Sequence, residues 1–405
     1  MATYTTVLDL GAYNNKLGNV QDYEPRIIPN YISKAKNERR KIFFGDQLYE
    51  CKDFSGLFYV LPFQKGYLVN WDVQRQLFDY MFNKDFLKVE VSDSNLIITE
   101  PQFNFTSIKE CLEEILFEEY KFNSICRITT AQLSSWQQKK DKTENHMCCL
   151  VVDSGFSFTH IVPVYKGQVL KKGVRRIDVG GKLLTNHLKE IISYRQLHVL
   201  DETFVMNQVK EDCCYVTNQF LEDLIITKKK KKENTIAQDY VLPDYTDVKR
   251  GFIRSQEDMW TKYTGTSQLL RMNNERFTVP ELLFRPSDLG IQQMGIPEAI
   301  VDAIESLPLP MHPHFYANVV LTGGNTLLPG FQNRVYTDLR SMAPIEFEVD
   351  VHLPKNPVTY AWHGGTVLSA EEDFVQKYCV TKQEYEESGR SICNKKFDSE
   401  VYIAL

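Results

Sequence analysis

Two stretches of the sequence share one plan, and this plan limits the folds open to the chain more than any other feature. VLDLGAYNNKLG (7–18) and LVVDSGFSFTHIV (150–162) each read as an apolar strand, an aspartate, any residue, a glycine, a short loop and a return strand. The two aspartates are Asp9 and Asp153. Two copies of one strand–Asp–x–Gly hairpin predict two similar domains that face each other.

The remaining sequence alternates strand-like and helix-like segments. Apolar runs that look buried predict strands at 5–11, 95–101, 146–155 and 318–324. Apolar residues spaced three and four apart predict helices at 71–83, 107–120 and 183–195, and a loop leading into a further helix at 356–369. This alternation predicts an α/β fold.

The composition narrows the class of protein. Hydrophobic residues make up 43% of the 405 residues and charged residues 25%, as in a soluble globular protein. We expect no membrane contact, because the N-terminus lacks a signal-peptide pattern and no apolar run approaches the roughly 20 residues that span a bilayer. Nine cysteines without CxxC spacing favour reduced thiols over a disulfide framework or a zinc site.

Basic charge is concentrated in two short segments, although the net charge of −6 gives the whole chain no attraction to nucleic acid. KAKNERRK (34–41) holds five basic residues, and Lys228 to Lys232 form an unbroken run. The run permits three interpretations: a solvated loop, a nuclear-import signal, or a contact to nucleosomal DNA. The polar residues from 234 to about 270 predict an inserted, loop-rich lobe.

The tips of the two hairpins are candidate phosphate sites. A tight hairpin exposes backbone N–H groups that attract phosphate oxygens, and glycines such as Gly11 and Gly155 let the backbone approach closely. Asp9 and Asp153 would then lie beside the phosphates, where carboxylates hold hydrated Mg²⁺. Lys16, on the first return strand, could reach a phosphate as a point charge.

A third candidate is VVLTGGNTLLPGF (319–331), which reads as a strand, a Gly-Gly turn and a helix start. The N-terminus of a helix favours anions. Each of the three motifs alone is more often an ordinary turn. Together, in this order, they indicate a phosphate-binding cleft.

The residues of these motifs and several others resemble the actin family, within the larger superfamily of actins, Hsp70 chaperones and sugar kinases. The resemblance covers nearly the whole chain. It rests on KGYLVNWDVQRQLFDYMF (65–82), IITEP (97–101), DSGFSFTHIVPVYKG (153–167), KEDCCYV (210–216), NERFTVPELLF (274–284), LTGGNTLLPG (321–330) and TKQEYEESGRSI (381–392).

The resemblance implies an actin fold, with two similar domains of two subdomains each around a nucleotide cleft. Subdomain 1 would comprise 1–30, 66–145 and 356–405. Subdomain 2 would be 31–65, with a short basic loop. Subdomain 3 would comprise 146–178 and 291–355, and subdomain 4 would be 179–290 with an insertion at about 228–270.

Two segments, 54–76 and 179–203, resemble most closely the actin-related proteins of SWR1-type and SRCAP-type remodellers. This implies a nuclear, non-catalytic scaffold subunit of an ATP-dependent complex that exchanges histone H2A.Z into nucleosomes, with the cytoplasm as a second location. Its partners would be a Snf2-type ATPase subunit, a small zinc-finger-type subunit and, through the complex, nucleosomal DNA.

Two alternatives remain open: an active actin-like ATPase, and a filament-forming cytoskeletal relative. The segment from 30 to 46 stands where actins carry a longer loop that contacts the next subunit of a filament. Because this segment is shorter and basic, we expect no self-polymerisation.

The resemblance also implies a ligand, ATP or ADP with Mg²⁺, and the residues around it. Those that match binding positions of the family are Asp9, Gly11, Lys16, Asp153, Gly155, Gly181, Lys210, Glu211, Gly323 and Gly324. Of these, Gly181 would lie at the ribose and Lys210 and Glu211 near the adenosine. We assign no catalytic residue and no side-chain metal site.

Several positions depart from the family pattern at the catalytic tip. Phe156 occupies the position of an aspartate that lies near the γ-phosphate in actins, and Tyr13 the position of a glycine in the first hairpin. Thr130 occupies the position of the glutamine that positions water, and Gln132 follows two residues later. His160 matches a kept histidine of the water network. Hydrolysis needs an oriented nucleophile and charge stabilisation together, so we expect slow or absent hydrolysis.

The residues expected around the adenosine match the family pattern only in part, because Leu328 replaces an aromatic residue and Val358 replaces a lysine. Nucleotide binding therefore stays open. In the other interpretation, Asp9 and Asp153 only end their strands, as a structural feature inherited from the family. Their carboxylates would accept hydrogen bonds from N–H groups of the turns, and the cleft would be empty or filled with water.

Overall fold

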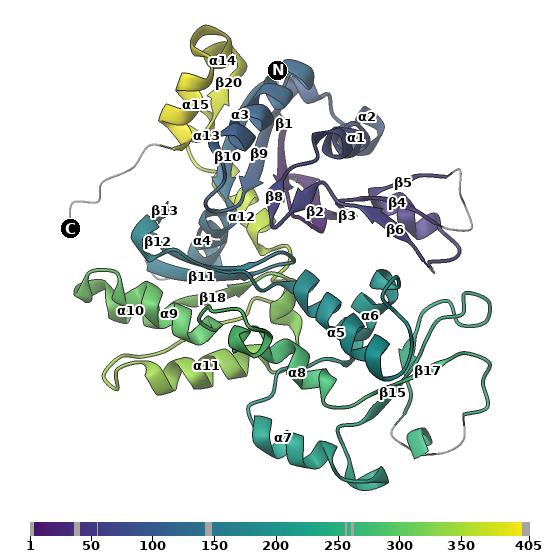
Figure 1. The fold of residues 1–405 in the computed structure, drawn as a ribbon. Helices are drawn as coiled ribbons and strands as arrows, with labels where there is room; N and C mark the ends of the chain where they lie inside the picture. The colour runs from purple at the N-terminus through teal and green to yellow at the C-terminus, as the bar shows by residue number, and fades with distance from the viewer. Residues whose placement is uncertain are drawn as a thin grey trace.

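Two related sheets form the centre of the molecule (Figure 1). The computed structural model describes residues 4–35, 41–54, 56–141, 148–255, 257–260 and 263–398. The upper sheet has the order β20-β10-β9-β1-β2-β3. Its strands are β1 (Tyr4–Asp9), β2 (Asn14–Asn19), β3 (Arg26–Pro29), β9 (Ser94–Glu100), β10 (Ser124–Thr129) and β20 (Val380–Thr381).

The lower sheet has the order β13-β12-β11-β18-β19, and β14 pairs with β12 beside β13. Its strands are β11 (Cys148–Ser154), β12 (Thr159–Tyr165), β13 (Gln168–Val169), β14 (Arg175–Ile177), β18 (Val319–Thr322) and β19 (Val351–His352).

Both sheets are built around one of the predicted hairpins. Strands β1 and β2 pair antiparallel with Asp9 opposite Lys16, and β11 and β12 pair antiparallel with Asp153 opposite His160. Each first strand then pairs in parallel with a strand from later in the chain, β1 with β9 and β11 with β18. The prediction of an α/β fold with two similar halves is therefore confirmed, while the subdomain boundaries stay predictions.

The helices cover the faces of these sheets, and the four helices that periodicity predicts are present at α1, α3, α5 and α12. In the upper half the longer ones are α1 (Trp71–Met81), α3 (Thr106–Glu114), α4 (Thr130–Asp141), α12 (Tyr360–Ser369), α14 (Lys382–Ser388) and α15 (Arg390–Phe397), and the short ones α2 (Lys84–Leu87) and α13 (Phe374–Tyr378). The predicted helix at 107–120 is divided, because α3 passes into a π-helical turn, η3 (Ile115–Glu119).

The lower half carries α5 (Gly181–Arg195), α6 (Thr203–Cys213), α7 (Phe220–Thr227), α8 (Glu275–Glu281), α9 (Ile296–Glu305), α10 (His312–Tyr316) and α11 (Phe331–Met342). Helix α5 forms where the sequence predicts it, because Leu184, Leu188 and Ile192 recur every four residues and are all buried.

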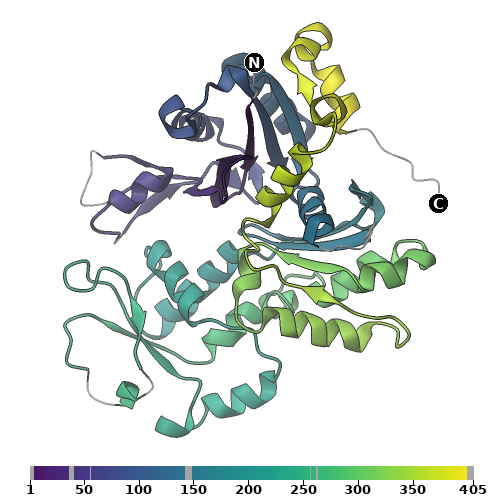
Figure 2. The ribbon, with the colours of Figure 1, turned by 180° about the vertical axis from the view of Figure 1, so that it is seen from behind.

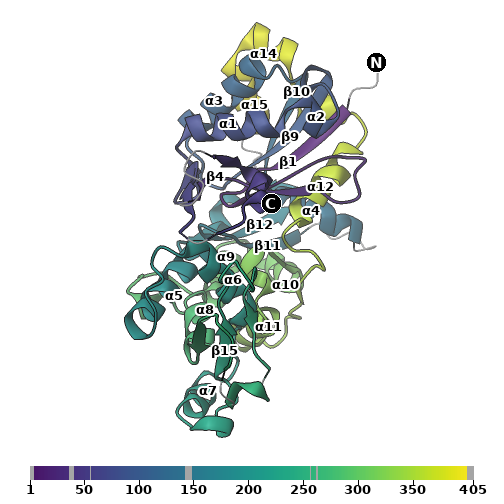
Figure 3. The same ribbon diagram turned by 90° about the vertical axis from the view of Figure 1, so that its right-hand side faces the viewer.

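Helices α4 and α12 pack against each other where the halves meet, as the rear and side views show (Figures 2 and 3). Helix α12 also contacts β1 of the upper sheet, and α4 contacts β11 of the lower sheet. This helix pair joins the two sheets on the side away from α5 and α6.

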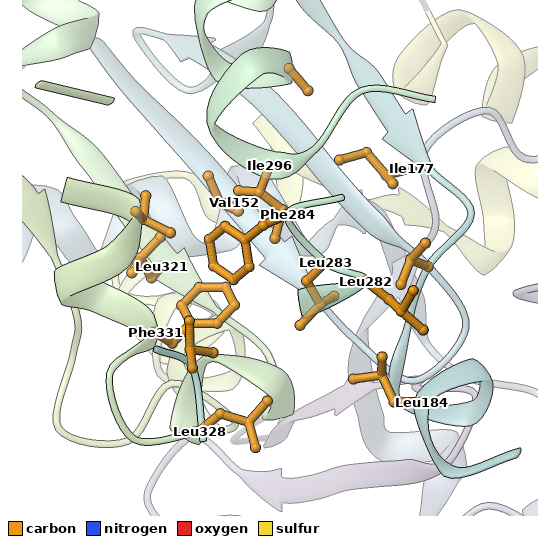
Figure 4. Packing of buried hydrophobic residues seen from close by; sticks show 14 of the residues in the cluster. Val152, Ile177, Leu184, Leu282, Leu283, Phe284, Ile296, Leu321, Leu328 and Phe331 are labelled. Atoms are coloured by element: carbon orange, nitrogen blue, oxygen red, sulfur yellow. The ribbon is translucent and has the colours of Figure 1, made fainter. Parts of the chain in front are cut away.

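The lower half holds the largest apolar core. Figure 4 shows Val152 of β11 and Leu321 of β18 beside the rings of Phe284 and Phe331, whose centroids lie 5.7 Å apart. Both strands are central in the sheet and covered on both faces, which explains their continuous apolar runs. This core fixes the strand ends that form the floor of the cleft.

The inserted segment is more ordered than the sequence predicts. It carries a sheet of order β16-β15-β17, made of β15 (Gln238–Val241), β16 (Phe252–Ile253) and β17 (Leu269–Met272). Tyr240, Leu270 and Met272 are fully buried in the lower core. Most of the described residues between 234 and 270 still lie outside strands and helices, as the prediction of a loop-rich lobe implies. The three strands were not predicted, because strands of two to four residues are too short to show periodicity.

A smaller sheet of order β5-β4-β6 projects from the upper half above α5 and α6 (Figure 1). Its strands are β4 (Ile32–Lys34), β5 (Phe43–Phe44) and β6 (Phe58–Val60), and the pair β7 (Phe63–Gln64) and β8 (Tyr67–Leu68) follows. Most of the basic segment 34–41 lies outside the described residues. In the ranges that the structure describes, no helix has the length and apolar run needed to cross a membrane.

Candidate functional site

A cleft of about 460 Å³ lies between the two halves, lined by the ends of both hairpins. All ten residues that the resemblance implies for nucleotide binding line it: Asp9, Gly11, Lys16, Asp153, Gly155, Gly181, Lys210, Glu211, Gly323 and Gly324. The tertiary fold thus brings together residues from five separate parts of the sequence.

The upper hairpin holds its two charged residues in contact with each other. The Lys16 Nζ lies 2.9 Å from Asp9 Oδ2, and both side chains are largely buried. Thr99 Oγ1, at the end of the neighbouring strand β9, donates to Asp9 Oδ1 at 2.8 Å. A phosphate in the cleft would compete with Asp9 for the Lys16 amine. Sequence reasoning missed Thr99, although parallel strands that end at one sheet edge would have indicated it.

The lower hairpin places Asp153 against Thr130, the first residue of α4. Thr130 Oγ1 donates to Asp153 Oδ2 at 2.9 Å. Burial raises the pKa of Asp153, and this hydrogen bond lowers it in part. Gln132 does not replace the absent glutamine, because its amide bonds to Thr129 and to the Gly167 carbonyl outside the cleft. Thr130 therefore fixes a carboxylate where the family pattern implies a residue that orients water.

The two largest departures from the family pattern touch each other. The rings of Tyr13 and Phe156, one from each hairpin, stack with centroids 4.6 Å apart and planes 27° from parallel. Tyr13 also packs against Tyr31 at 5.4 Å, and burial raises the pKa of Tyr13 to about 12. Apolar ring carbon thus occupies the tip of the cleft, and it joins the upper half to the lower half.

The amine of Lys210 is already bonded within the protein. Its Nζ donates to Asn207 Oδ1 at 2.9 Å, to Thr185 Oγ1 at 3.0 Å and to the Gly181 carbonyl at 3.3 Å. Burial lowers the pKa of Lys210. Asn207 in turn donates to Glu211 Oε1 at 2.8 Å. The predicted pair near the adenosine is therefore present, but it is engaged in a local network that stabilises α6.

The Gly-Gly turn differs from its prediction in one respect. A four-residue 3₁₀ turn, η9 (Gly324–Leu327), follows β18, and the α-helix begins only at Phe331. The predicted strand, turn and helix start are therefore present, but the helix that follows the glycine pair is a single 3₁₀ turn instead of an α-helix. Asn325, which the sequence analysis overlooked next to the glycine pair, donates to the Gly155 carbonyl at 2.8 Å and links the turn to the lower hairpin.

Gly323 is required by the backbone at this junction. Its φ is +89°, and a Cβ would lie 2.3 Å from the Ser154 carbonyl oxygen. Gly290 offers a matched control, because its φ is +77° and no atom lies within 4 Å of the position that a Cβ would take. We expect Gly323→Ala to lower the free energy of unfolding by roughly 1–3 kcal/mol more than Gly290→Ala, since rigid backbone must move. Urea unfolding of both variants measures this, and equal losses would contradict the close packing.

Direct contacts also join the two halves at the mouth of the cleft. Phe54 stacks on Phe204 of α6 with centroids 4.7 Å apart, and the Gly56 amide donates to the Glu202 carboxylate at 3.0 Å. The small upper sheet is thereby attached to the helices below it. One connection is a stack of two side-chain rings, and the other joins a backbone amide to a carboxylate.

We expect Phe204→Ala to loosen the mouth of the cleft. The ring pair is worth about 0.5–1.5 kcal/mol beyond its buried area, so amide hydrogen exchange at Gly56 should rise by up to roughly tenfold. Tyr23→Ala, which removes an exposed ring from the upper half, serves as the control. Unchanged exchange at Gly56 in Phe204→Ala would show that the stack does not hold the mouth.

The imidazole of His160 lines the cleft and is packed mainly against aromatic carbon. Its Nε2 is buried and has no hydrogen-bond partner among the described residues, and its ring packs on Phe158 at 4.0 Å. Burial lowers the pKa of His160 to about 3, and the charge of Arg176 adds to the lowering. The imidazole is therefore neutral across the physiological pH range.

A sequence model of the family described as Actin matches residues 2–398. The chain belongs to the actin family. Its fold agrees with this, since both hairpins, the Gly-Gly turn and the cleft between them lie within the matched residues.

This actin-family chain is similar over nearly its full length to several proteins named actin-related protein 6. That of Drosophila melanogaster is 44% identical over 98% of this chain and 100% of its own length. That of Dictyostelium discoideum is 33% identical over 96% of this chain and 94% of its own length. That of Oryza sativa subsp. indica is 34% identical over 96% of this chain and 98% of its own length. The resemblance to the actin-related proteins is thus confirmed.

Proposed function

We propose that this actin-family protein is a non-catalytic scaffold subunit of a nuclear, ATP-dependent chromatin remodeller that exchanges histone H2A.Z into nucleosomes. The observation that carries the proposal is the Tyr13–Phe156 stack, because it places apolar rings where an actin ATPase needs charge and water. The similarity to proteins named actin-related protein 6 supports the choice of family branch.

The chemistry of the cleft supports the absence of catalysis. Hydrolysis of a phosphoanhydride needs an oriented water and stabilisation of the developing charge. Thr130 is bonded to Asp153, His160 is neutral and packed against an aromatic ring, and Phe156 offers no polar atom. The Thr130 hydroxyl thus donates to a carboxylate instead of to a water, and Phe156 brings no polar group to the tip of the cleft.

Some residues of the cleft do fit a bound nucleotide. Gly324 has no neighbouring atom within 4 Å of its Cβ position, and Gly155 has its nearest at 3.7 Å, so phosphate oxygens can approach both backbones. Lys16 would supply a positive charge to ATP or ADP, and Asp9 and Asp153 would hold hydrated Mg²⁺ through water. A bound nucleotide would add binding energy between the halves, and these residues would orient its phosphates.

Affinity purification from nuclear extract tests the scaffold directly. We expect the tagged chain to co-purify with a Snf2-type ATPase and a small zinc-finger-type subunit, and the complex to bind nucleosomes. Asp153→Ala should co-purify equally well, since the proposal assigns no role in assembly to hydrolysis. Failure to recover any Snf2-type ATPase would contradict the proposal. We expect no pellet when the chain alone is sedimented in polymerising salt.

A working ATPase is the second candidate. The observation in its favour is that Asp9, Lys16 and Asp153 remain together at the floor of the cleft. Steady Mg²⁺-dependent turnover that disappears in Asp153→Ala would favour this function over the scaffold.

A further inference from the structure

Helix α7 leaves apolar side chains exposed to solvent. Its sequence FLEDLIIT contains five apolar residues among eight, yet none of its residues is buried. Leu221 is 75% exposed and Ile225 is 61% exposed. The helix lies at the far tip of the lower half, away from the cleft and the upper sheet (Figures 1 and 3).

The lysine run follows directly on the C-terminal end of this helix. The amides of Lys228 and Lys229 donate to the carbonyls of Ile225 and Ile226, so the helical path extends past Thr227. Lys228 and Lys229 therefore follow the last turn of α7 directly, three and four residues after Ile225. The exposed lysines Lys228, Lys229, Lys230 and Lys232, together with Leu221 and Ile225, are called the α7 surface below.

The α7 surface is held in place from its inner side. Phe220 packs edge-on against Phe277 of α8, with centroids 5.4 Å apart. The Thr227 carbonyl accepts from the side-chain amides of Asn234 at 3.1 Å and Asn273 at 3.2 Å. The helix is therefore pre-positioned by the body of the lower half, which lowers the entropy cost of binding to its outer face.

We propose that the α7 surface docks an acidic amphipathic segment of another protein. Apolar side chains of that segment would cover Leu221 and Ile225, and its carboxylates would face the lysines. The helix dipole favours lysines near the C-terminus of a helix, which explains the first lysines of the run. It does not explain why Leu221 and Ile225 are exposed. The proposal goes beyond the scaffold function and stands whether or not the chain belongs to a remodeller.

Two other occupants fit the α7 surface less well. A second copy of this chain would meet it through a two-fold contact, which would bring like-charged lysines together. Nucleic acid would match the lysines, but it would leave Leu221 and Ile225 without apolar cover. The combination of both features favours an acidic protein segment.

A labelled synthetic helix tests the proposal by fluorescence anisotropy. The probe carries leucines at three- and four-residue spacing and glutamates elsewhere, and a scrambled peptide of equal composition is its control. We expect the probe to bind the full chain. The double variant Leu221→Ser with Ile225→Ser should weaken this binding at least tenfold, and so should a variant in which the four exposed lysines are replaced by glutamine. Leu309→Ser with Ile345→Ser, which removes exposed apolar residues elsewhere, should leave the affinity unchanged.

Three results would overturn the proposal. Absent binding, or equal binding to all variants and to the scrambled peptide, would show that the α7 surface is only solvated. Tight binding of duplex DNA that needs the lysines but not Leu221 and Ile225, without peptide binding, would assign the surface to nucleic acid. A concentration-dependent dimer that Leu221→Ser with Ile225→Ser abolishes would assign it to self-association.

Discussion

Replacing Arg127 by leucine should lower the free energy of unfolding by about 3–5 kcal/mol at pH 7, since it leaves buried carboxylates without a counter-charge. The Arg127 guanidinium is almost fully buried and bonds to Glu113 of α3, to Glu100 at the end of β9 and to Asp398 near the C-terminus. Glu100 ends strand β9 and lines the cleft, so Arg127 also fixes one wall of the site. Urea unfolding monitored by fluorescence measures the loss.

The loss should depend on pH. Burial raises the pKa of Glu113, and Arg127 lowers it in part, so the variant raises the folded-state pKa further above the unfolded value. A carboxyl of this kind destabilises the fold above its unfolded pKa, and the penalty is relieved as pH falls through the folded pKa. The deficit of Arg127→Leu should therefore be smaller at pH 5 than at pH 7.

The matched control for this variant is Arg390→Leu. Arg390 also contacts two carboxylates, Glu110 and Glu114, but all three side chains are substantially exposed. Exposed ion pairs contribute about 0–1 kcal/mol, so this variant should lose no more than that. Equal losses in the two variants, or a deficit that grows on acidification, would contradict a buried charge network at Arg127.

Removing the stack between Tyr13 and Phe156 should give the second-largest effect. We expect each alanine variant to lose about 2–3 kcal/mol, less than a fully buried ring, because both rings are only partly buried. The double variant should show a coupling energy of roughly 0.5–1.5 kcal/mol. The same variants should raise hydrogen exchange of the amides that line the cleft, since the stack joins the two halves.

The stack between Phe117 and Tyr385 provides the control cycle. These rings lie 4.4 Å apart and 18° from parallel, but both belong to the upper half. Their cycle should give a comparable coupling without any change in exchange at the cleft. If Tyr13→Ala and Phe156→Ala were additive and left cleft exchange unchanged, the stack would not connect the halves.

The sequence predicts the local parts of this molecule well. Each strand–Asp–x–Gly hairpin is encoded by consecutive residues, and so is the turn at Gly323, so pattern and turn chemistry are sufficient to place them. The ten candidate residues come from the resemblance to the actin family, which implies that they converge on one cleft. The structure brings all of them to one cleft.

The contacts that close the cleft could not be predicted in the same way. Tyr13 and Phe156 each look like an isolated departure in the sequence, and only the approach of the two halves shows that they stack. Phe54 and Phe204 are likewise distant in the chain, and no periodicity relates them. The short strands of the insertion were missed because two to four residues carry no pattern.

The central claim is that this cleft no longer hydrolyses ATP, and single-turnover phosphate release tests it most directly. The purified chain, in excess over γ-labelled ATP and Mg²⁺, is compared with Asp153→Ala in parallel. We predict that both release phosphate at the rate of the protein-free control, because Phe156 is apolar and Thr130 is hydrogen-bonded to Asp153. Mg²⁺-dependent release by the unmodified chain that Asp153→Ala abolishes would contradict the account.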